Sequence, residues 1–196
     1  MTRPPTLGHN RGPALEPGAG WRGYCWRRAK ADLRPARVPI EMVRVRMRRA
    51  RELGLTYPQY ASILAGTGRD VMAFLYTVEG LQIRLSRQLR LPPEVAAKLP
   101  EIKGAAQIAF APSGEVPQDF AAELSQVART PLTAHAMQPD APGWGAARRA
   151  IRAALDPARL PSNAVVLIGG PAEQEGWAEA ASMARYLPTD TFFAPS

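Results

Sequence analysis

The stretch NAVVLIGGPAEQEGWAEAASMARYLPTDTFFAP, residues 163–195, decides the fold class. It contains an apolar run at 164–168, a Gly169-Gly170 turn, an alanine-rich stretch at 173–186 and a second apolar run at 191–194. These features predict a strand, a helix and a strand in succession, which is a βαβ unit whose two strands lie parallel in one sheet.

The sequence upstream repeats this alternation of strands and helices. Residues 71–77 and 106–111 are nearly continuous apolar runs, typical of strands covered on both faces, and 132–137 fits either a fifth strand or a loop. Helices are expected at about 80–90, 93–102, 117–128 and 143–155. We therefore predict an α/β fold with a small doubly wound, mostly parallel sheet of four or five strands and right-handed crossovers.

The sequence before this sheet divides into two parts. Residues 1–20 hold four prolines and four glycines with few large apolar side chains, so they are expected to form a flexible arm. Residues 21–66 are basic and have a helical pattern. We expect them to pack on the α/β domain of residues 67–196, because about 40 residues make a poor core alone.

Three helices are predicted within residues 21–66. The first ends at Pro35, the second starts near Pro39 and is capped by Gly54, and the third runs from the N-cap Thr56 to Ala65, before Gly66 and Gly68. The expected inward-facing residues are Trp21, Cys25, Ala29 and Leu33 in the first helix, Ile40, Val43, Met47 and Ala50 in the second, and Tyr60, Ile63 and Leu64 in the third.

Composition excludes several classes of protein. Of the 196 residues, 46% are hydrophobic and 21% charged, which suffices for a globular core. No stretch approaches the roughly 18 uninterrupted apolar residues of a membrane span, and the start has no apolar segment for secretion, so we expect a cytoplasmic protein without a membrane. Cys25, His9 and His135 cannot supply a disulfide or a zinc cage, and we expect no metal and no cofactor.

The net charge of +8 is concentrated at the front of the chain. Residues 1–60 hold 13 Lys+Arg against 4 Asp+Glu, whereas residues 61–196 hold 12 against 13. A positively charged N-terminal region attracts polyanions, and nucleic acid is the polyanion that we expect first. Codon usage is the competing explanation, because 22 of the 25 basic residues are arginine.

Aromatic and basic residues alternate near the start of the helical segment. Aromatic rings stack on unpaired bases and guanidinium groups pair with phosphates, so this mixture suits nucleic acid. It also suits a protein partner, since Trp, Tyr and Arg dominate interface hot spots. The expected nucleic-acid-binding residues are Arg22, Trp26, Arg27, Arg28, Lys30, Arg44, Arg48 and Arg51.

The segment ELGLTYPQYASILAGTGRDVMAFL, residues 52–75, resembles the helix-turn-helix pattern of bacterial repressors. The resemblance implies that Arg69 points into the major groove. Residues 71–77 would then form the recognition helix, although they are apolar almost throughout and fit a core strand better.

A second candidate site follows from topology. Residues after parallel strands gather at the carboxyl edge of the sheet, where ligands of open α/β sheets bind. The residues expected there are Glu79, Ser113, Glu115, Gly169 and Gly170. The sequence GAGWRG at 18–23 matches a dinucleotide fingerprint, but no strand precedes it.

Catalytic motifs are missing from the sequence. His135 has no nucleophile or carboxylate at motif spacing, and there is no P-loop or nucleophile elbow. We therefore expect a non-catalytic cytoplasmic protein that binds nucleic acid through residues 21–51. Two alternatives stay open: an α/β enzyme or binder of a nucleotide or phosphorylated metabolite at the sheet edge, and an accessory subunit that docks on a protein through its N-terminal arm and helices.

Overall fold

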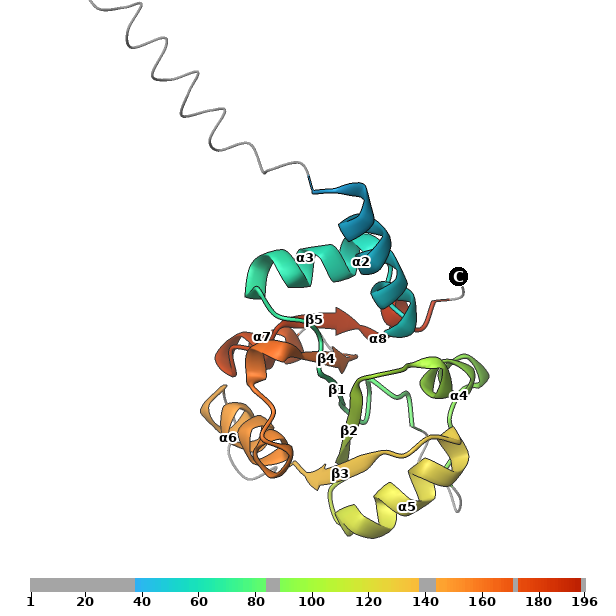
Figure 1. Ribbon diagram of the computed structural model, residues 1–196. Helices are drawn as coiled ribbons and strands as arrows, with labels where there is room; N and C mark the ends of the chain where they lie inside the picture. The colour runs from blue at the N-terminus through green and yellow to red at the C-terminus, as the bar shows by residue number, and fades with distance from the viewer. Residues whose placement is uncertain (1–37, 84–88, 138–143, 171–172, 195–196) are drawn as a thin grey trace, which may run out of the picture. The chain divides into compact units, whose positions relative to one another are not determined.

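A parallel sheet of five strands forms the centre of the α/β unit. The computed structural model describes residues 38–83, 89–137, 144–170 and 173–194. All neighbouring strands are parallel, and their order is β3-β2-β1-β4-β5 (Figure 1). The strands are β1 (Ala73–Tyr76), β2 (Ala106–Ala111), β3 (Thr133–Ala136), β4 (Val165–Gly169) and β5 (Arg185–Pro188). The predicted doubly wound α/β fold is confirmed.

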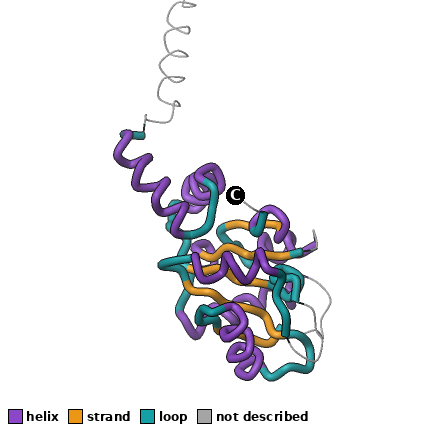
Figure 2. The backbone as a smooth tube through the Cα atoms, turned by 90° about the vertical axis from the view of Figure 1, so that its right-hand side faces the viewer, coloured by secondary structure: helices purple, strands orange, loops and turns teal. Residues whose placement is uncertain are grey.

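Helices cover both faces of this sheet (Figure 2). The first face carries α2 (Ile40–Glu52) by its C-terminal end, α3 (Tyr57–Thr67), α4 (Pro93–Lys98) with the 3-10 turn Leu99–Glu101, α5 (Pro117–Ala128) and α8 (Thr189–Phe192). The second face carries α6 (Trp144–Leu155) and α7 (Glu173–Ala180), with 3-10 turns at Asp156–Ala158 and Ser162–Ala164. The chain therefore changes face between β3 and β4.

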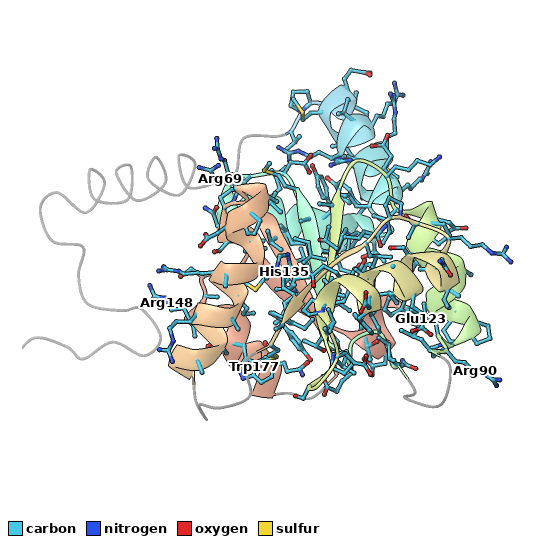
Figure 3. All side chains as sticks on the ribbon, turned by 90° about the horizontal axis from the view of Figure 1, so that it is seen from below. Arg69, Arg90, Glu123, His135, Arg148 and Trp177 are labelled. Atoms are coloured by element: carbon cyan, nitrogen blue, oxygen red, sulfur yellow. The ribbon has the colours of Figure 1, made fainter. Side chains whose placement is uncertain are left out.

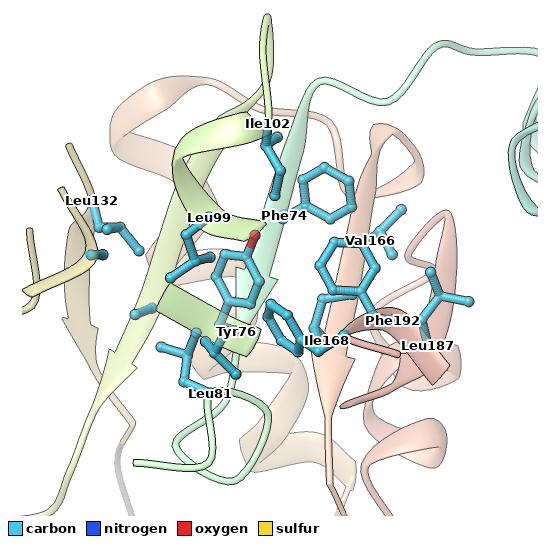
Figure 4. Close-up of a cluster of buried hydrophobic side chains, with 14 of the residues drawn as sticks. Phe74, Tyr76, Leu81, Leu99, Ile102, Leu132, Val166, Ile168, Leu187 and Phe192 are labelled. Carbon is cyan, nitrogen blue, oxygen red and sulfur yellow. The ribbon is translucent and has the colours of Figure 1, made fainter. Parts of the chain in front are cut away.

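The two cores follow from the alternation of side chains along the strands. In β1, Phe74 and Tyr76 pack in the first core, whereas Ala73 and Leu75 pack in the second. Figure 4 shows Phe74, Tyr76 and Phe192 together in the first core, where the rings of Phe74 and Phe192 lie 5.3 Å apart. Both faces of β1 are buried, so its residues form a continuous apolar run rather than an alternating one.

The third predicted helix is confirmed in detail by α3. Thr56 is its N-cap: its hydroxyl accepts from the Gln59 backbone N at 3.4 Å, and Gln59 Oε1 accepts from the Thr56 backbone N at 2.9 Å. This reciprocal pair is a capping box, which satisfies two backbone donors. Gly68 ends the helix at φ +66°, whereas Gly66 lies inside it.

The prediction of a strand at 191–194 is wrong. Residues Thr189–Phe192 form the short helix α8, and the fifth strand is β5, in the segment expected to be helical. The helix over 173–186 ends early, at Ala180, and Ser182 adopts φ +53° before the chain joins the sheet through Ala184 N to Val165 O. Phe192 and Phe193 are apolar because they cover the sheet, not because they belong to it.

Two helical predictions are also corrected. No helix forms over Gly80–Ile83 or Leu89–Arg90, and residues 84–88 lie outside the described ranges. In α2 the predicted inward stripe holds only at Ala50, because Ile40 is 63% exposed and Met47 is 40% exposed. Residues 132–137, for which the sequence allowed either a strand or a loop, contain the strand β3.

The helix-turn-helix resemblance does not hold, and the core strand that the sequence favoured for residues 71–77 is confirmed. Its recognition helix would need residues 71–77, but Ala73–Tyr76 form the central strand β1. All four residues of this strand are buried, so they face no groove of DNA.

Candidate functional site

The carboxyl ends of β1 and β4 form the point where the chain changes face. In open α/β sheets this point holds the ligand crevice. Here the backbone N of Thr77 donates to Ile168 O at 3.0 Å, so the chain leaving β1 stays against β4. The loop after β1 therefore crosses the place where the crevice would open.

Side chains of this loop and of α7 meet in a hydrogen-bonded network. The Thr77 hydroxyl donates to Gln174 Oε1 at 2.9 Å and accepts from the Gly80 N at 2.9 Å. Gln174 Oε1 also accepts from Gly170 N at 3.1 Å. The amide Nε2 of Gln174 donates to Glu79 Oε2 at 2.9 Å. Thr77 is 1% and Gln174 2% exposed, so the amide of Gln174 fills the crevice from within.

Three glycines permit this close packing. A Cβ on Gly80 would lie 2.2 Å from the carbonyl oxygen of Ile168, and one on Gly169 would lie 2.3 Å from Gln174 Oε1. A Cβ on Gly170 would lie 2.8 Å from the Cβ of Glu79. These approaches leave no room for a larger side chain, so the glycines serve the contact between the two loops.

This arrangement differs from a phosphate cradle. Such a cradle needs a glycine-rich turn that leads from the strand directly into a helix. After β1 the next described helix begins only at Pro93. After β4 the Gly169-Gly170 turn does precede α7, which begins at Glu173, but Gly170 N donates to Gln174 Oε1 at 3.1 Å and so is used within the protein. We find three of the five predicted edge residues together here, namely Glu79, Gly169 and Gly170.

The other two predicted edge residues, Ser113 and Glu115, follow the carboxyl end of β2 but take no part in the hydrogen bonds of this network. Ser113 and Glu115 are exposed in the turn after β2, where Glu115 N donates to Pro112 O at 3.2 Å. Gln174, which links the loop after β1 to the turn after β4, is not among the residues predicted from the sequence. Its signal was a polar residue one turn past a Gly-Gly pair, where a helix start is expected.

The predicted basic site is described only from α2 onward. Arg44, Arg48 and Arg51 are all exposed, at spacing i, i+4 and i+7 on one side of the helix. The remaining predicted residues, Arg22, Trp26, Arg27, Arg28 and Lys30, lie outside the described ranges.

Arg49, on the same helix, has a different role. Its guanidinium donates to Asp70 Oδ2 at 2.8 Å and to three backbone oxygens, those of Val71, Gly104 and Lys103, at 3.2, 3.0 and 3.2 Å. It also reaches Glu52 at 3.3 Å. This arginine joins α2 to the segments that enter β1 and β2, so it belongs to the fold and not to the basic face.

Apolar side chains are also exposed along α2. Seven large hydrophobic residues are exposed in the described part of the chain, and five of them fall within residues 38–47. They are Val38, Ile40, Met42, Val45 and Met47. No residue between Ile40 and Arg49 is fully buried. Val45 and Met47 belong, with the sheet, to the compact unit Arg44–Ser196, and exposed apolar side chains that lie close together can contact a partner.

His135 and Tyr76, both titratable residues of the sheet, have shifted pKa values. Burial lowers the pKa of the His135 imidazole on β3 and raises that of the Tyr76 phenol well above its usual value. Figure 3 shows His135, on the edge strand β3, apart from Glu123 on α5. Within residues 38–83, 89–137, 144–170 and 173–194, no group of three His, Cys, Asp or Glu side chains could hold a metal ion, and no helix is long and apolar enough to cross a bilayer.

Comparisons of the chain with known proteins found no significant match. The chain matches no protein-family model, and it has no significant match among curated protein sequences or solved structures.

Proposed function

We propose that the protein is a non-catalytic, cytoplasmic nucleic-acid-binding protein that contacts phosphates through α2. The observation that carries the proposal is the shared exposed side of Arg44, Arg48 and Arg51. At a rise of about 1.5 Å per residue, Arg44 and Arg51 are about 10 Å apart along the helix axis. That distance spans several phosphates of one strand, which follow at roughly 3.4 Å along the duplex axis.

The local charge supports this proposal. Between Met42 and Arg51 the helix holds five arginines and no acidic residue. Arg49 is neutralised within the fold by Asp70 and Glu52. Arg48 and Arg51 have no ion pair in the described part of the chain, so their charge is available to an external anion.

Salt dependence tests the proposal. Three arginine–phosphate contacts on a duplex give a slope of log Kd against log salt with a magnitude of about 2.7, so affinity falls about 40-fold between about 50 and 200 mM salt. Binding of labelled duplex and single-stranded DNA and RNA would be measured by fluorescence anisotropy across this range. Replacing Arg48 and Arg51 by glutamine is expected to reduce the duplex slope by about 1.8.

A matched control separates a site from general charge. Arg148→Gln/Arg149→Gln removes the same charge from exposed positions on α6, and Figure 3 shows Arg148 projecting outward there. This variant is expected to keep the wild-type slope. Equal losses in the two variants, or affinity that does not change with salt, would refute a phosphate-binding face on α2.

A second candidate function is supported by the exposed apolar residues of α2. They favour an accessory subunit that docks on a protein through this helix, because apolar side chains gain little from contact with the charged backbone of a nucleic acid. Val45→Ser/Met47→Ser would then abolish co-purification with the partner, whereas Arg48→Gln/Arg51→Gln would weaken it less. Nucleic-acid binding should stay undetectable for the full chain and for both variants.

The sheet-edge function stays a prediction. A nucleotide or phosphorylated metabolite at this edge would have to displace the Gln174 amide from Thr77 and Glu79. A thermal-shift screen over such compounds tests it, because a ligand specific to the folded state raises the melting temperature.

A further inference from the structure

A cavity of about 530 Å³, partly open to solvent, lies beside the C-terminal end of α2. Its walls come from the α2–α3 connection, from α4 with the turn that follows it, and from α8 (Figure 1). The volume falls within the range of small-molecule sites. Leu55, Ala97, Phe192 and Phe193 give it an apolar floor, while Thr56, Gln59 and Thr191 add polar groups.

Four charged side chains line this cavity: Arg51, Lys98, Glu94 and Glu101. Lys98 already has partners. Its ammonium donates to the carbonyl of Phe192 and lies 4.2 Å from the centre of that ring, and burial lowers its pKa while Glu101 opposes the shift. The side chain also lies against Gly54, where an added Cβ would be 2.9 Å from Lys98 Cε. Lys98 therefore fixes the cavity wall.

Arg51 and Glu94 are the two charged side chains of the lining that can bind a ligand. Both are exposed, and neither side chain has a hydrogen bond or ion pair within the residues that the structure describes. They come from different walls, Arg51 from the last turn of α2 and Glu94 from the first turn of α4. A guanidinium binds a carboxylate in a two-pronged manner, and a carboxylate binds an ammonium.

We infer that this cavity binds a small zwitterion, a free amino acid or a short peptide. Its carboxylate pairs with Arg51, its ammonium with Glu94, and its carbon skeleton lies over the exposed Ala97. Gln59 completes the site: its Oε1 is used by the Thr56 backbone N, which leaves its amide N–H groups for the ligand. The inference goes beyond the proposed nucleic-acid contact but shares Arg51 with it. Glu94→Gln leaves all the arginines of α2 in place, so it tests the zwitterion site separately from phosphate binding.

Thermal unfolding of the full chain tests the site. The probes are the free L-amino acids and glycyl dipeptides, each compared with its N-acetylated and its C-amidated form. At about 100 times its Kd, a zwitterion that binds only the folded state is expected to raise the melting temperature by roughly 5–10 °C. Each blocked form lacks one charge and is expected to lose most of this shift.

Variants locate the binding. Arg51→Gln and Glu94→Gln should each remove the shift, whereas Arg152→Gln and Glu179→Gln, at exposed positions outside the cavity, should retain it. All four positions are on the surface, so the variants keep the fold. The inference is overturned if no zwitterion raises the melting temperature, if blocked forms act equally, or if the two cavity variants bind like the controls.

Discussion

Replacing Arg49 by alanine is expected to cost far more stability than any other arginine substitution on α2. Its guanidinium makes three hydrogen bonds to backbone oxygens, each worth about 1 kcal/mol net. The ion pair with Asp70 adds little, about 0–1 kcal/mol, since the Asp70 side chain is 47% exposed. The side chain of Arg49 itself is only 20% exposed.

These contributions give a loss of about 2–4 kcal/mol in the free energy of unfolding. For a chain of this size that corresponds to a fall of roughly 5–15 °C in the melting temperature. Urea unfolding followed by circular dichroism would give the free energy, and calorimetry the temperature. Arg49→Lys keeps the charge but loses the planar fork, so an intermediate loss is expected.

Arg48→Ala is the matched control, because Arg48 is exposed one residue away. A surface substitution of this kind changes stability by less than about 0.5 kcal/mol. If Arg49→Ala and Arg48→Ala were equally stable, Arg49 would not join α2 to the fold as described, and the distinction between structural and available arginines would fail.

Two further predictions concern backbone space and pH. Gly80→Ala should destabilise the fold by at least about 2 kcal/mol, because its Cβ would meet the Ile168 carbonyl oxygen at 2.2 Å, whereas Gly66→Ala, with nothing within 4 Å on α3, should stabilise it by about 0.5–1 kcal/mol. Urea midpoints measure both, and equal effects would contradict the packing at the sheet edge. For His135, burial lowers the pKa of the folded state, so the unfolded chain binds more protons below pH about 6.5. Stability from this group is therefore full above that pH and falls on acidification; His135→Gln should lose less stability than the wild type between about pH 7 and pH 5, and parallel curves would argue against the shift.

Sequence patterns predicted the centre of the sheet better than its rim. Strands β1, β2 and β4 are buried on both faces, so their apolar runs are unambiguous. The edge strand β5 has the sequence RYLP, with only Leu187 fully buried, and follows an alanine-rich helix without a clear stop. The sequence of β5 is therefore a weak signal for a strand, whereas Phe192 and Phe193 after it have the apolar pattern typical of one.

The candidate sites show the same limit. Spacing alone placed Arg44, Arg48 and Arg51 on one side of a helix, and the structure agrees. It could not reveal that Gln174 fills the sheet edge, because that contact joins residues 97 positions apart in the sequence. It also could not show that the apolar residues of α2 are exposed, since periodicity indicates which residues share a side but not what covers them.

No residue from Ile40 to Arg48 is fully buried, and this has a thermodynamic consequence. Helical segments this short are marginal in water without tertiary packing, so this part of α2 opens by local fraying rather than by global unfolding. Its backbone amides will exchange with solvent far faster than those of β1. Any partner that engages the helix must supply the free energy of its ordering, and protection of these amides from exchange will report that occupancy directly.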